Sequence, residues 1–415
     1  MEEVNEAAPN EGALSGLRVI ELATVLAGPL CGQTLADHGA TVIKVEPPAG
    51  DQTRISIHNV NGQPAYFSGV NRNKACIALD LSSSRGKEVL LRLLETADVL
   101  LENFLPGTLE KWGLGYHAVL SLRFPRLIHC SISGFGADGP LGGRPGYDAM
   151  AQAYCGLMSV NGSKEAGATR HGIPIADIAT GLNAIIGILL ALNERTRSGR
   201  GQHIDVSLFD TGLALQHPYA AIWFGSGVAP GPVGNGHPDV APYNKFAAKN
   251  GDIFIGAPKD LQFRRLVQFL KHPELGDDPR FSAAHSRVAN KEALEQLLAP
   301  LIAQYDFEVL SDALMRAQVA AAPVYSIPQA FQAAHAAHRK MHVRVGNYQG
   351  IGNPIKLSRS KATIRSVPRG FAEDARAILS ELGYNQSEID AMFSDGSVPA
   401  PGAIADSLPS SPKSK

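Results

Sequence analysis

The sequence predicts an α/β protein with a mostly parallel, doubly wound sheet and a second, smaller domain. Strand patterns and helical patterns alternate along the first half of the chain, and this alternation is typical of parallel strands joined by crossover helices. The chain has 415 residues, of which 44% are hydrophobic and 19% are charged. It can therefore bury a large core and is long enough for two domains.

The first strand, helix and strand form a βαβ unit. Residues 17–22 have the apolar pattern of a buried strand, Pro29 suits the first turn of a helix that ends near His38, and residues 41–45 resume as a strand. The same alternation predicts, in order, a helix over 84–96, a strand over 98–102, short helices near Leu109 and Val119, a strand over 126–133, a strand over 203–207 and a helix from Leu208. Right-handed crossovers between these strands give a doubly wound sheet.

A change of composition predicts the domain boundary. Residues 225–242 are rich in Gly and Pro, which is typical of a linker. Beyond them, Asn250-Gly251 lies between two strand-like segments and predicts a hairpin with a type I′ turn. We therefore expect a disordered lead at 1–13, the first part of a large domain at 14–224, a small α+β domain at 225–326, a return to the large domain at 327–396 and a flexible tail at 397–415.

Charge and composition exclude several classes of partner. The net charge is −1 and the sequence pI is about 6.9, so no basic field attracts nucleic acid or an anionic membrane surface. Asp177 and Asn183 interrupt the longest apolar run, which argues against a membrane span. The first thirteen residues hold four Glu and no Lys or Arg, unlike a secretory or mitochondrial leader. The four cysteines are widely separated, so we expect a cytoplasmic protein without a zinc site or a disulfide framework.

One carboxylate, Asp177, is the candidate nucleophile. It precedes an apolar run, Ile178 to Leu192, whose only polar side chains are Thr180 and Asn183. This run predicts a helix that is buried nearly all round. Asp177 would lie at its N-cap, where unpaired backbone N–H groups and the helix dipole keep a carboxylate ionised. The same position also suits an Asp that only caps a core helix.

A glycine-rich segment resembles a dinucleotide site but fails a physical test. Residues 134–139 match the G-x-G-x-x-G pattern and follow a predicted strand. Dinucleotide binding requires a helix to begin at these glycines, so that its N-terminus meets the pyrophosphate. Pro140 and Pro145 follow with two more glycines between them and prevent that helix. We expect a loop that brings backbone close to a ligand.

Three histidines suggest a metal site that their surroundings oppose. His335, His338 and His342 are three and four residues apart, as on one helical face. They lie beside Arg339 and Lys340, and neither a carboxylate nor a cysteine joins them. A solvated helix surface is favoured, and we expect no metal.

Seven short segments together resemble a class III (family III) CoA-transferase, the group that includes formyl-CoA transferase, carnitine CoA-transferase and succinyl-CoA:glutarate CoA-transferase. The segments are Val25-Leu26-Ala27-Gly28-Pro29, Val42-Ile43-Lys44-Val45-Glu46, Asn71-Arg72-Asn73-Lys74, Glu102-Asn103-Phe104-Leu105-Pro106-Gly107, Arg144-Pro145-Gly146-Tyr147-Asp148, Ala176-Asp177 and Thr196-Arg197-Ser198-Gly199-Arg200-Gly201-Gln202. Each is short, but their order and spacing match from residue 25 to residue 202.

The resemblance implies a fold, a nucleophile and a set of CoA contacts. The fold would be a Rossmann-like large domain made from both ends of the chain, a small domain between them, and two ring-like subunits interlocked into a dimer. Asp177 would be the nucleophile, and acyl-CoA would be a substrate, with no tightly bound cofactor. The implied CoA contacts are Leu79, Asp80, Leu81, Ser82, Asn103, Phe104, Leu105, Lys111, Arg144, Pro145, Gly146 and Tyr147. Lys111 and Arg144 suit CoA phosphates, one as a point charge and one as a fork.

Departures from the family pattern narrow the expected activity. Related α-methylacyl-CoA racemases place a His base where Tyr147 stands, and a phenol with an unperturbed pKa of about 10 is a poor base near pH 7. Formyl-CoA transferases carry a Gln where Leu26 stands and a glycine run where residues 255–259 read Ile-Gly-Ala-Pro-Lys. A common C-terminal Gly-Glu-His segment is absent near residues 370–373.

We therefore expect CoA transfer from an acyl-CoA, succinyl-CoA above all, to a carboxylic acid, above all a dicarboxylate. A racemase-type enzyme and a formyl-CoA or carnitine-type transferase are the alternatives. The expected partners are the acyl-CoA, the acid and a second copy of the chain.

Overall fold

The computed structural model describes residues 12–55, 58–60 and 63–403. The chain forms two compact units: unit 1 takes Met1–Leu157, His171–His217 and His338–Lys415, and unit 2 takes Met158–Arg170 and Pro218–Ala337. Most of the expected lead at 1–13 and tail at 397–415 lies outside the described residues. The first tail residues are not flexible as predicted, because Ser397 and Val398 are buried.

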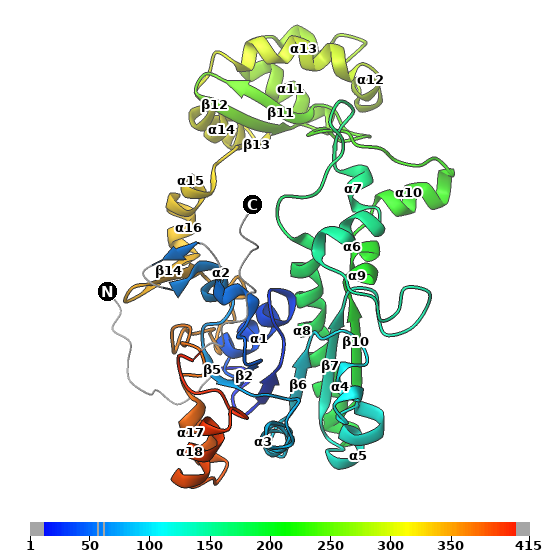
Figure 1. Ribbon diagram of the computed structural model, residues 1–415. Helices are drawn as coiled ribbons and strands as arrows, with labels where there is room; N and C mark the ends of the chain where they lie inside the picture. The colour runs from blue at the N-terminus through cyan, green and yellow to red at the C-terminus, as the bar shows by residue number, and fades with distance from the viewer. Residues whose placement is uncertain (1–11, 56–57, 61–62, 404–415) are drawn as a thin grey trace, which may run out of the picture. The chain divides into compact units, whose positions relative to one another are not determined.

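A six-stranded parallel sheet forms the centre of unit 1, which confirms the predicted α/β class (Figure 1). In the order β10-β7-β6-β1-β2-β5, its strands are His203–Ser207, Ile128–Ser133, Val99–Glu102, Arg18–Glu21, Thr41–Glu46 and Lys74–Ala78. Adjacent strands pair in parallel throughout. Five of them follow the predicted strands, because short apolar runs of this length are buried on both faces of a parallel sheet. Strand β5 was not predicted.

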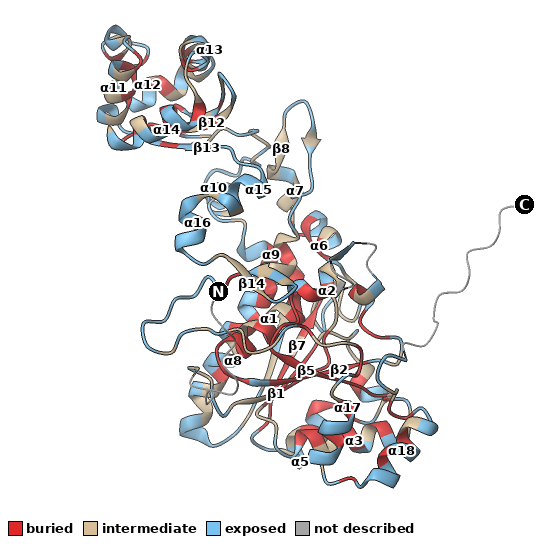
Figure 2. Cartoon of the chain, turned by 90° about the vertical axis from the view of Figure 1, so that its left-hand side faces the viewer, coloured by how far each residue is buried: buried red, intermediate tan, exposed pale blue. Residues whose placement is uncertain are grey.

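Two layers of helices cover the sheet of unit 1. α1 (Ala27–Asp37) and α8 (Ile175–Ser198) pack on the face where alternate strand residues such as Val19 and Leu101 are buried. α3 (Ser84–Leu94), α17 (Ala375–Glu381) and α18 (Gln386–Ser394) pack on the other face, against residues such as Ile20 and Leu100. Figure 2 shows the buried strands as the centre between these helices. Both faces of the sheet are therefore covered.

The C-terminal part of unit 1 returns to the strand β5. The N–H of Asn73 donates to Ser366 O at 3.1 Å, and the N–H of Cys76 donates to the Asp374 carboxylate at 2.9 Å. The elements of this return before α17 are β14 (His342–Val345) and β15 (Tyr348–Ile351). The short helix α16 (Ala334–His338) precedes them, and only its last residue belongs to unit 1.

Short elements connect the strands of unit 1. They are η1 (Gln52–Ile55), β3 (Asn59–Val60), β4 (Gln63–Pro64), α2 (Ala65–Gly69), α4 (Thr108–Lys111), η2 (Tyr116–Leu120), α5 (Ser121–Arg123), α6 (Asp148–Tyr154) and α9 (Leu208–Ala214). No helix lies between Ser133 and Asp148, a stretch that is fully described. The glycine segment 134–139 is thus a loop, as its prolines predict.

Unit 2 has its own antiparallel sheet and core. The sheet order is β11-β12-β13, with strands Tyr243–Ala248, Gly251–Gly256 and Ala320–Pro323. The other elements are α7 (Leu157–Val160), β8 (Gly162–Ser163), β9 (Gly167–Ala168), α10 (Tyr219–Ser226), α11 (Asp260–Phe269), η3 (Pro273–Gly276), α12 (Ala284–Ala289), α13 (Lys291–Ile302), α14 (Phe307–Arg316) and α15 (Ile327–Gln332). Apolar residues of α11, α13 and α14 and of the three strands form one buried cluster.

Two local predictions are wrong in detail. The hairpin β11–β12 exists, but Ala248 pairs with Gly251, so its two-residue loop is Lys249-Asn250. Neither loop residue has a positive φ, and a type I′ turn requires one at both positions. The three histidines do not share one helical face either, because α16 ends at His338 and His342 begins strand β14.

Helix α8 is longer and less buried than the sequence predicts. It begins at Ile175 rather than Ile178 and ends at Ser198. It is not buried nearly all round in the single chain, because Leu182, Ile186 and Leu190 are 47%, 54% and 65% exposed. Its length and apolar composition alone would also suit a membrane span, but a core helix of a soluble protein meets the same criteria.

Candidate active site

The carboxyl ends of the parallel strands meet at one edge of the sheet in unit 1. The chain runs from β1 to β2 and β5, then returns beside β1 as β6, so the strand order reverses between β1 and β6. Such a reversal opens a ligand crevice in α/β sheets. Asn103, directly after β6, accepts the N–H of Thr24 at 2.9 Å and donates to Thr24 O at 2.7 Å. This side chain therefore joins the loops that follow β6 and β1.

Helix α1 begins at this crevice without a side-chain cap. Leu26 is its N-cap residue, and no side chain bonds to the first turn. Gly28 allows a close approach here, because a Cβ at this position would lie 2.2 Å from the Cβ of Ala23. In the part of the chain that the structure describes, the N–H groups of Ala27 and Gly28 have no hydrogen-bond partner. Unpaired N–H groups at a helix start can bind an anion or a polarised carbonyl oxygen.

The first turn of α8 is capped by a carboxylate from another element. Asp148, the first residue of α6, accepts the N–H of Ala176 at 2.9 Å and the N–H of Asp177 at 3.3 Å. Its second oxygen accepts from the Gln152 side chain at 2.6 Å. Asp148 is only 7% exposed, so it holds the start of α8 from inside the protein.

Asp177 is therefore the third residue of α8 and not its N-cap as predicted. Burial, and then the neighbouring Asp148 charge, raise the pKa of Asp177 to about 7. The expectation that helix N–H groups keep this carboxylate ionised is wrong, because Asp148 accepts those N–H groups itself. Among the described residues, no donor bonds to the Asp177 carboxylate oxygens. A half-buried carboxylate that few groups stabilise is more basic and more nucleophilic than an exposed one.

Asp177 faces the start of α1. One turn later on α8, a Cβ at Gly181 would lie 2.7 Å from Ala27 O. Residues four apart lie on the same face of a helix, with side chains tilted toward its N-terminus. The Asp177 side chain therefore lies on the face that packs against α1, whose course beside α8 can be followed in Figure 1. The Tyr66 phenol of α2 also lies near Asp177. Burial raises the pKa of Tyr66, and the negative charges of Asp177, Asp148 and Asp51 raise it further.

The expected CoA contacts all lie in unit 1 and follow the carboxyl ends of strands. Leu79–Ser82 form the turn after β5, in which the Asp80 side chain accepts the N–H and hydroxyl of Ser82 at 2.9 and 2.6 Å. Asn103–Leu105 follow β6, and Lys111 ends α4. Arg144–Tyr147 pack against the loop after β7, where a Cβ at Gly146 would lie 2.9 Å from the Cα of Gly134.

The two expected phosphate ligands are exposed cations. The side chains of Lys111 and Arg144 are exposed and form no ion pair with any described residue. Leu105, Pro145 and Tyr147 are exposed too, whereas Leu79 and Leu81 are buried behind their turn. Residues 79 and 81 can therefore offer a ligand only their backbone.

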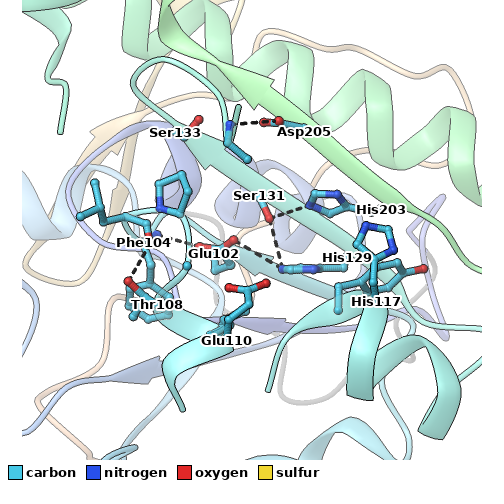
Figure 3. Close-up of a pocket in the computed structure, with 16 residues that line it drawn as sticks. Glu102, Phe104, Thr108, Glu110, His117, His129, Ser131, Ser133, His203 and Asp205 are labelled. Carbon is cyan, nitrogen blue, oxygen red and sulfur yellow. Dashed lines mark hydrogen bonds and ion pairs between the residues drawn. The ribbon is translucent and has the colours of Figure 1, made fainter. Parts of the chain in front are cut away.

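A pocket of about 80 Å³ lies on one face of the same sheet (Figure 3). Its walls come from β6, β7 and β10 and from the loop that holds Phe104 and Leu105. The Nε2 of His129 lies 3.3 Å from the Ser131 hydroxyl and 3.4 Å from the Glu102 carboxylate. The Nε2 of His203 lies 3.0 Å from the same hydroxyl. Burial and the neighbouring His129 lower the pKa of His203, which favours a neutral imidazole at His203.

Sequence reasoning missed this polar cluster. His129 and Ser131 alternate along a strand that otherwise reads as apolar, and they pair in register with His203 and Asp205 of β10. The polar alternation within residues 126–133 is the one signal that was available. Across the described residues, no group of three or more His, Cys, Asp or Glu is arranged to hold a metal ion.

Comparison with known proteins decides the family. The model of the protein family described as "CoA-transferase family III" matches residues 14–371 of this chain. The chain belongs to CoA-transferase family III. It is 38% identical to acetyl-CoA:oxalate CoA-transferase of Acetobacter aceti, over 86% of this chain and 92% of that protein. It is 36% identical to succinate–glutarate CoA-transferase of Agrobacterium fabrum, over 89% of this chain and 95% of that protein.

A solved structure supports the same assignment. The chain resembles the crystal structure of a CaiB/BaiF family protein from Brucella suis with a TM-score of 0.83 and 39% identity, over 89% of this chain and 99% of that one. The protein is thus a class III CoA-transferase that uses acyl-CoA substrates. The predicted family, enzyme class and acyl-CoA chemistry are confirmed.

Proposed function

We propose that this transferase moves CoA from succinyl-CoA to a dicarboxylate, with Asp177 as the nucleophile. The observation that supports this role is a carboxylate at the start of α8 with a pKa of about 7 and no hydrogen-bond donor on its oxygens among the described residues. About half of it is ionised at pH 7, and among the described residues neither a cation nor a backbone amide holds it. Such a carboxylate can attack an acyl carbon.

The chemistry runs through two acyl intermediates on this side chain. The Asp177 carboxylate attacks the thioester carbonyl, a C–O bond forms, the C–S bond breaks, and CoA leaves as a thiolate. The thiolate attacks the Asp177 acyl carbon of the anhydride, which releases the donor acid and leaves an aspartyl-CoA thioester. The acceptor carboxylate then attacks this thioester, CoA leaves again, and the thiolate takes the acceptor acyl group. The thioester energy is conserved, so the cycle needs neither ATP nor a metal.

The start of α1 can stabilise the charge that develops on each carbonyl oxygen. The N–H groups of Ala27 and Gly28 are unpaired in the described chain. Ala27 packs against Gly181, which lies one turn after Asp177 on α8. Fixed N–H donors that meet a developing oxyanion lower the barrier of acyl transfer. Lys111 and Arg144 would bind the CoA phosphates, and Asn103 would hold the crevice in shape.

The names of several relatives favour a dicarboxylate acceptor. Relatives 35–37% identical to this chain are a succinyl-CoA:glutarate CoA-transferase of Mus musculus and a succinyl-CoA:mesaconate CoA-transferase of Haloarcula hispanica. Both names pair succinyl-CoA with a dicarboxylate. The acetyl-CoA:oxalate enzyme pairs another donor with a dicarboxylate, so the acceptor class has broader support than the donor.

A second copy of the chain is the proposed partner of α8. Leu182, Ile186 and Leu189 form an exposed apolar stripe at helical spacing, and Leu190 lies beside it. A stripe of this kind is typical of a surface that another subunit covers. An interlocked dimer would bury it. Leu190→Glu should then give monomers in light scattering, and an unchanged dimer mass would contradict this role for α8.

The decisive test replaces the nucleophile and traps its intermediate. Asp177→Ala should abolish exchange between succinyl-CoA and a panel of dicarboxylates, followed by mass spectrometry of new thioesters. Hydroxylamine added with acyl-CoA should convert Asp177 of the unaltered enzyme into a hydroxamate. Asp210→Ala is the matched control, because Asp210 is also the third residue of its helix, α9, but is exposed. A fully active Asp177→Ala enzyme would exclude the proposed mechanism.

A further inference from the structure

Val25, in the loop between β1 and α1, has an unusual backbone conformation. Its φ is 70°, in the left-handed region that favours glycine. A β-branched side chain is a genuine outlier there. Such a conformation persists only where the surrounding structure imposes it, and it is concentrated at functional sites. The residue lies directly before Leu26, the N-cap of α1.

Buried and half-buried side chains hold the backbone around Val25. Lys44 donates to Ala23 O at 2.7 Å. The Asn103 side chain bonds to the backbone N–H and the backbone carbonyl of Thr24. The N–H of Val25 itself donates to the Asp51 carboxylate at 3.3 Å. Just beyond, Lys74 donates to Pro29 O at 2.9 Å. Hydrogen bonds from buried or half-buried side chains therefore hold the loop on both sides of Val25.

Asp51 is the one of these groups that bonds to the strained residue. It is 1% exposed, and the Oδ1 that accepts Val25 also accepts the N–H and hydroxyl of Thr53 at 2.9 and 2.7 Å. Its Oδ2 forms an ion pair with Lys44 at 3.0 Å. Burial would raise its pKa, but Lys44 and the Thr53 bonds outweigh it and leave the pKa of Asp51 lowered. The group is a fixed anion.

Asp51 is the first member of a chain of buried ion pairs, in which two carboxylates and two lysines balance in charge. Lys44 also pairs with Glu21 at 3.2 Å, and Glu21 pairs with Lys74 at 2.8 Å. All four charged side chains are fully buried. Replacing such ion pairs by apolar residues is often neutral or stabilising, so their presence is weak support for a role in stability alone. A role in fixing one backbone arrangement fits them better.

We propose that Asp51 is a positioning residue of the transfer reaction. Through the N–H of Val25 it holds the turn that aims the first N–H groups of α1 at the oxyanion that forms when the acyl group is attacked beside Asp177. This inference rests on the proposed function, because it assigns those N–H groups to the oxyanion. Without Asp51, Val25 relaxes toward a negative φ, and the start of α1 moves away from the face of α8 that carries Asp177.

A glycine substitution separates this role from a structural one. Glycine adopts a φ of 70° without steric penalty, so Val25→Gly removes the need for a group that imposes it. Asp51→Ala should lower kcat about tenfold or more, with the KM for acyl-CoA changed by less than about threefold, since a misplaced oxyanion donor acts on the transition state. The double variant Val25→Gly/Asp51→Ala should recover most of the lost kcat. Its melting temperature should stay as low as that of Asp51→Ala, because the partner of Lys44 is still missing.

Asp37→Ala is the matched control. Asp37 is a buried carboxylate in an ion pair with Arg72 at 2.6 Å, at the other end of α1, about 15 Å from Ala27 along the helix. Its loss should lower the melting temperature but not kcat, and Val25→Gly should bring no recovery. Asp51→Asn keeps an oxygen for the Val25 N–H and should retain more activity than Asp51→Ala. Asp51→Val, which is close to Asp in size but offers no acceptor, replaces the alanine variant if that variant does not fold.

Each result decides between the two roles. Unchanged kcat in a folded Asp51→Ala enzyme overturns the inference. So does an Asp51→Asn enzyme that is no more active than Asp51→Ala, or a double variant that recovers no activity. Recovery of kcat and melting temperature together points to a purely structural role and also overturns it. Activity in Asp177→Ala overturns the proposed function instead, and this inference falls with it.

Discussion

Replacing Asp177 by asparagine should make the protein more stable at pH 8 while it removes the proposed nucleophile. Burial and Asp148 raise the pKa of Asp177 to about 7, from a reference of 3.8. The folded state therefore binds this proton more tightly than the unfolded state does, and stability falls as pH rises from about 4 to about 7. A neutral asparagine has no charge to desolvate and none for Asp148 to repel.

The size of the effect follows from the difference in pKa. About three pH units at about 1.4 kcal/mol each give an upper limit of about 4 kcal/mol at pH 8. Asp177 keeps some contact with solvent, which screens its interaction with Asp148, so we expect about 2 kcal/mol. At pH 5 the folded carboxyl is already protonated, and the advantage of asparagine should be about half as large.

The assay is urea unfolding of both proteins at pH 5 and pH 8, at equal protein concentration because subunit association shifts apparent stability. Asp210→Asn serves as the control, since an exposed Asp should change stability by less than about 0.5 kcal/mol. An Asp177→Asn protein that is no more stable than the unaltered enzyme at pH 8 would refute the reasoning. An advantage that does not grow between pH 5 and pH 8 would refute it as well.

Three further outcomes follow from other contacts. Lys111→Ala and Arg144→Ala should each raise the KM for acyl-CoA by about fivefold to tenfold and leave kcat unchanged, and the effect should weaken in high salt, because each loses one charge-assisted phosphate contact. Arg287→Met should lower the free energy of unfolding of unit 2 by about 3 kcal/mol, measured by urea unfolding, since the fully buried guanidinium bonds to three backbone carbonyls. A 2-methylacyl-CoA incubated in D2O should gain no deuterium by mass spectrometry, and measurable exchange would favour racemase chemistry.

Most strands, and the place of Asp177 at the start of a long apolar helix, were predictable because their signals are local. The apolar runs at 17–22, 41–45 and 98–102 are short, and each is bounded by polar or turn residues, so each specifies a buried strand by itself. Asp177 stands at the start of an apolar helix, which is visible within ten residues. The exposure of α8 was not predictable, since periodicity reports apolar character and not what covers it.

The surroundings of the nucleophile were not predictable, because they depend on residues that folding brings together. Asp148 caps α8 from a different helix, and no spacing rule connects it to Ala176. The raised pKa of Asp177 follows from that contact and from burial. The polar pocket depends on the register that sets His203 opposite His129. The apolar alternation within one strand shows which face of the sheet a side chain takes. It does not show which residue of a strand far along the chain lies opposite.

The bonds between residues 73–80 and the C-terminal return set an order for the assembly of the enzyme. Asn73, Cys76 and Asp80 bond to Ser366, Asp374 and Ser397. Contacts so distant along the chain close slowly and late. On the ribosome, the turn expected to receive CoA must wait until nearly all of the described polypeptide has been synthesised, including the whole of unit 2. Nascent chains stalled before residue 366 should therefore bind no CoA, however well their first strands have paired.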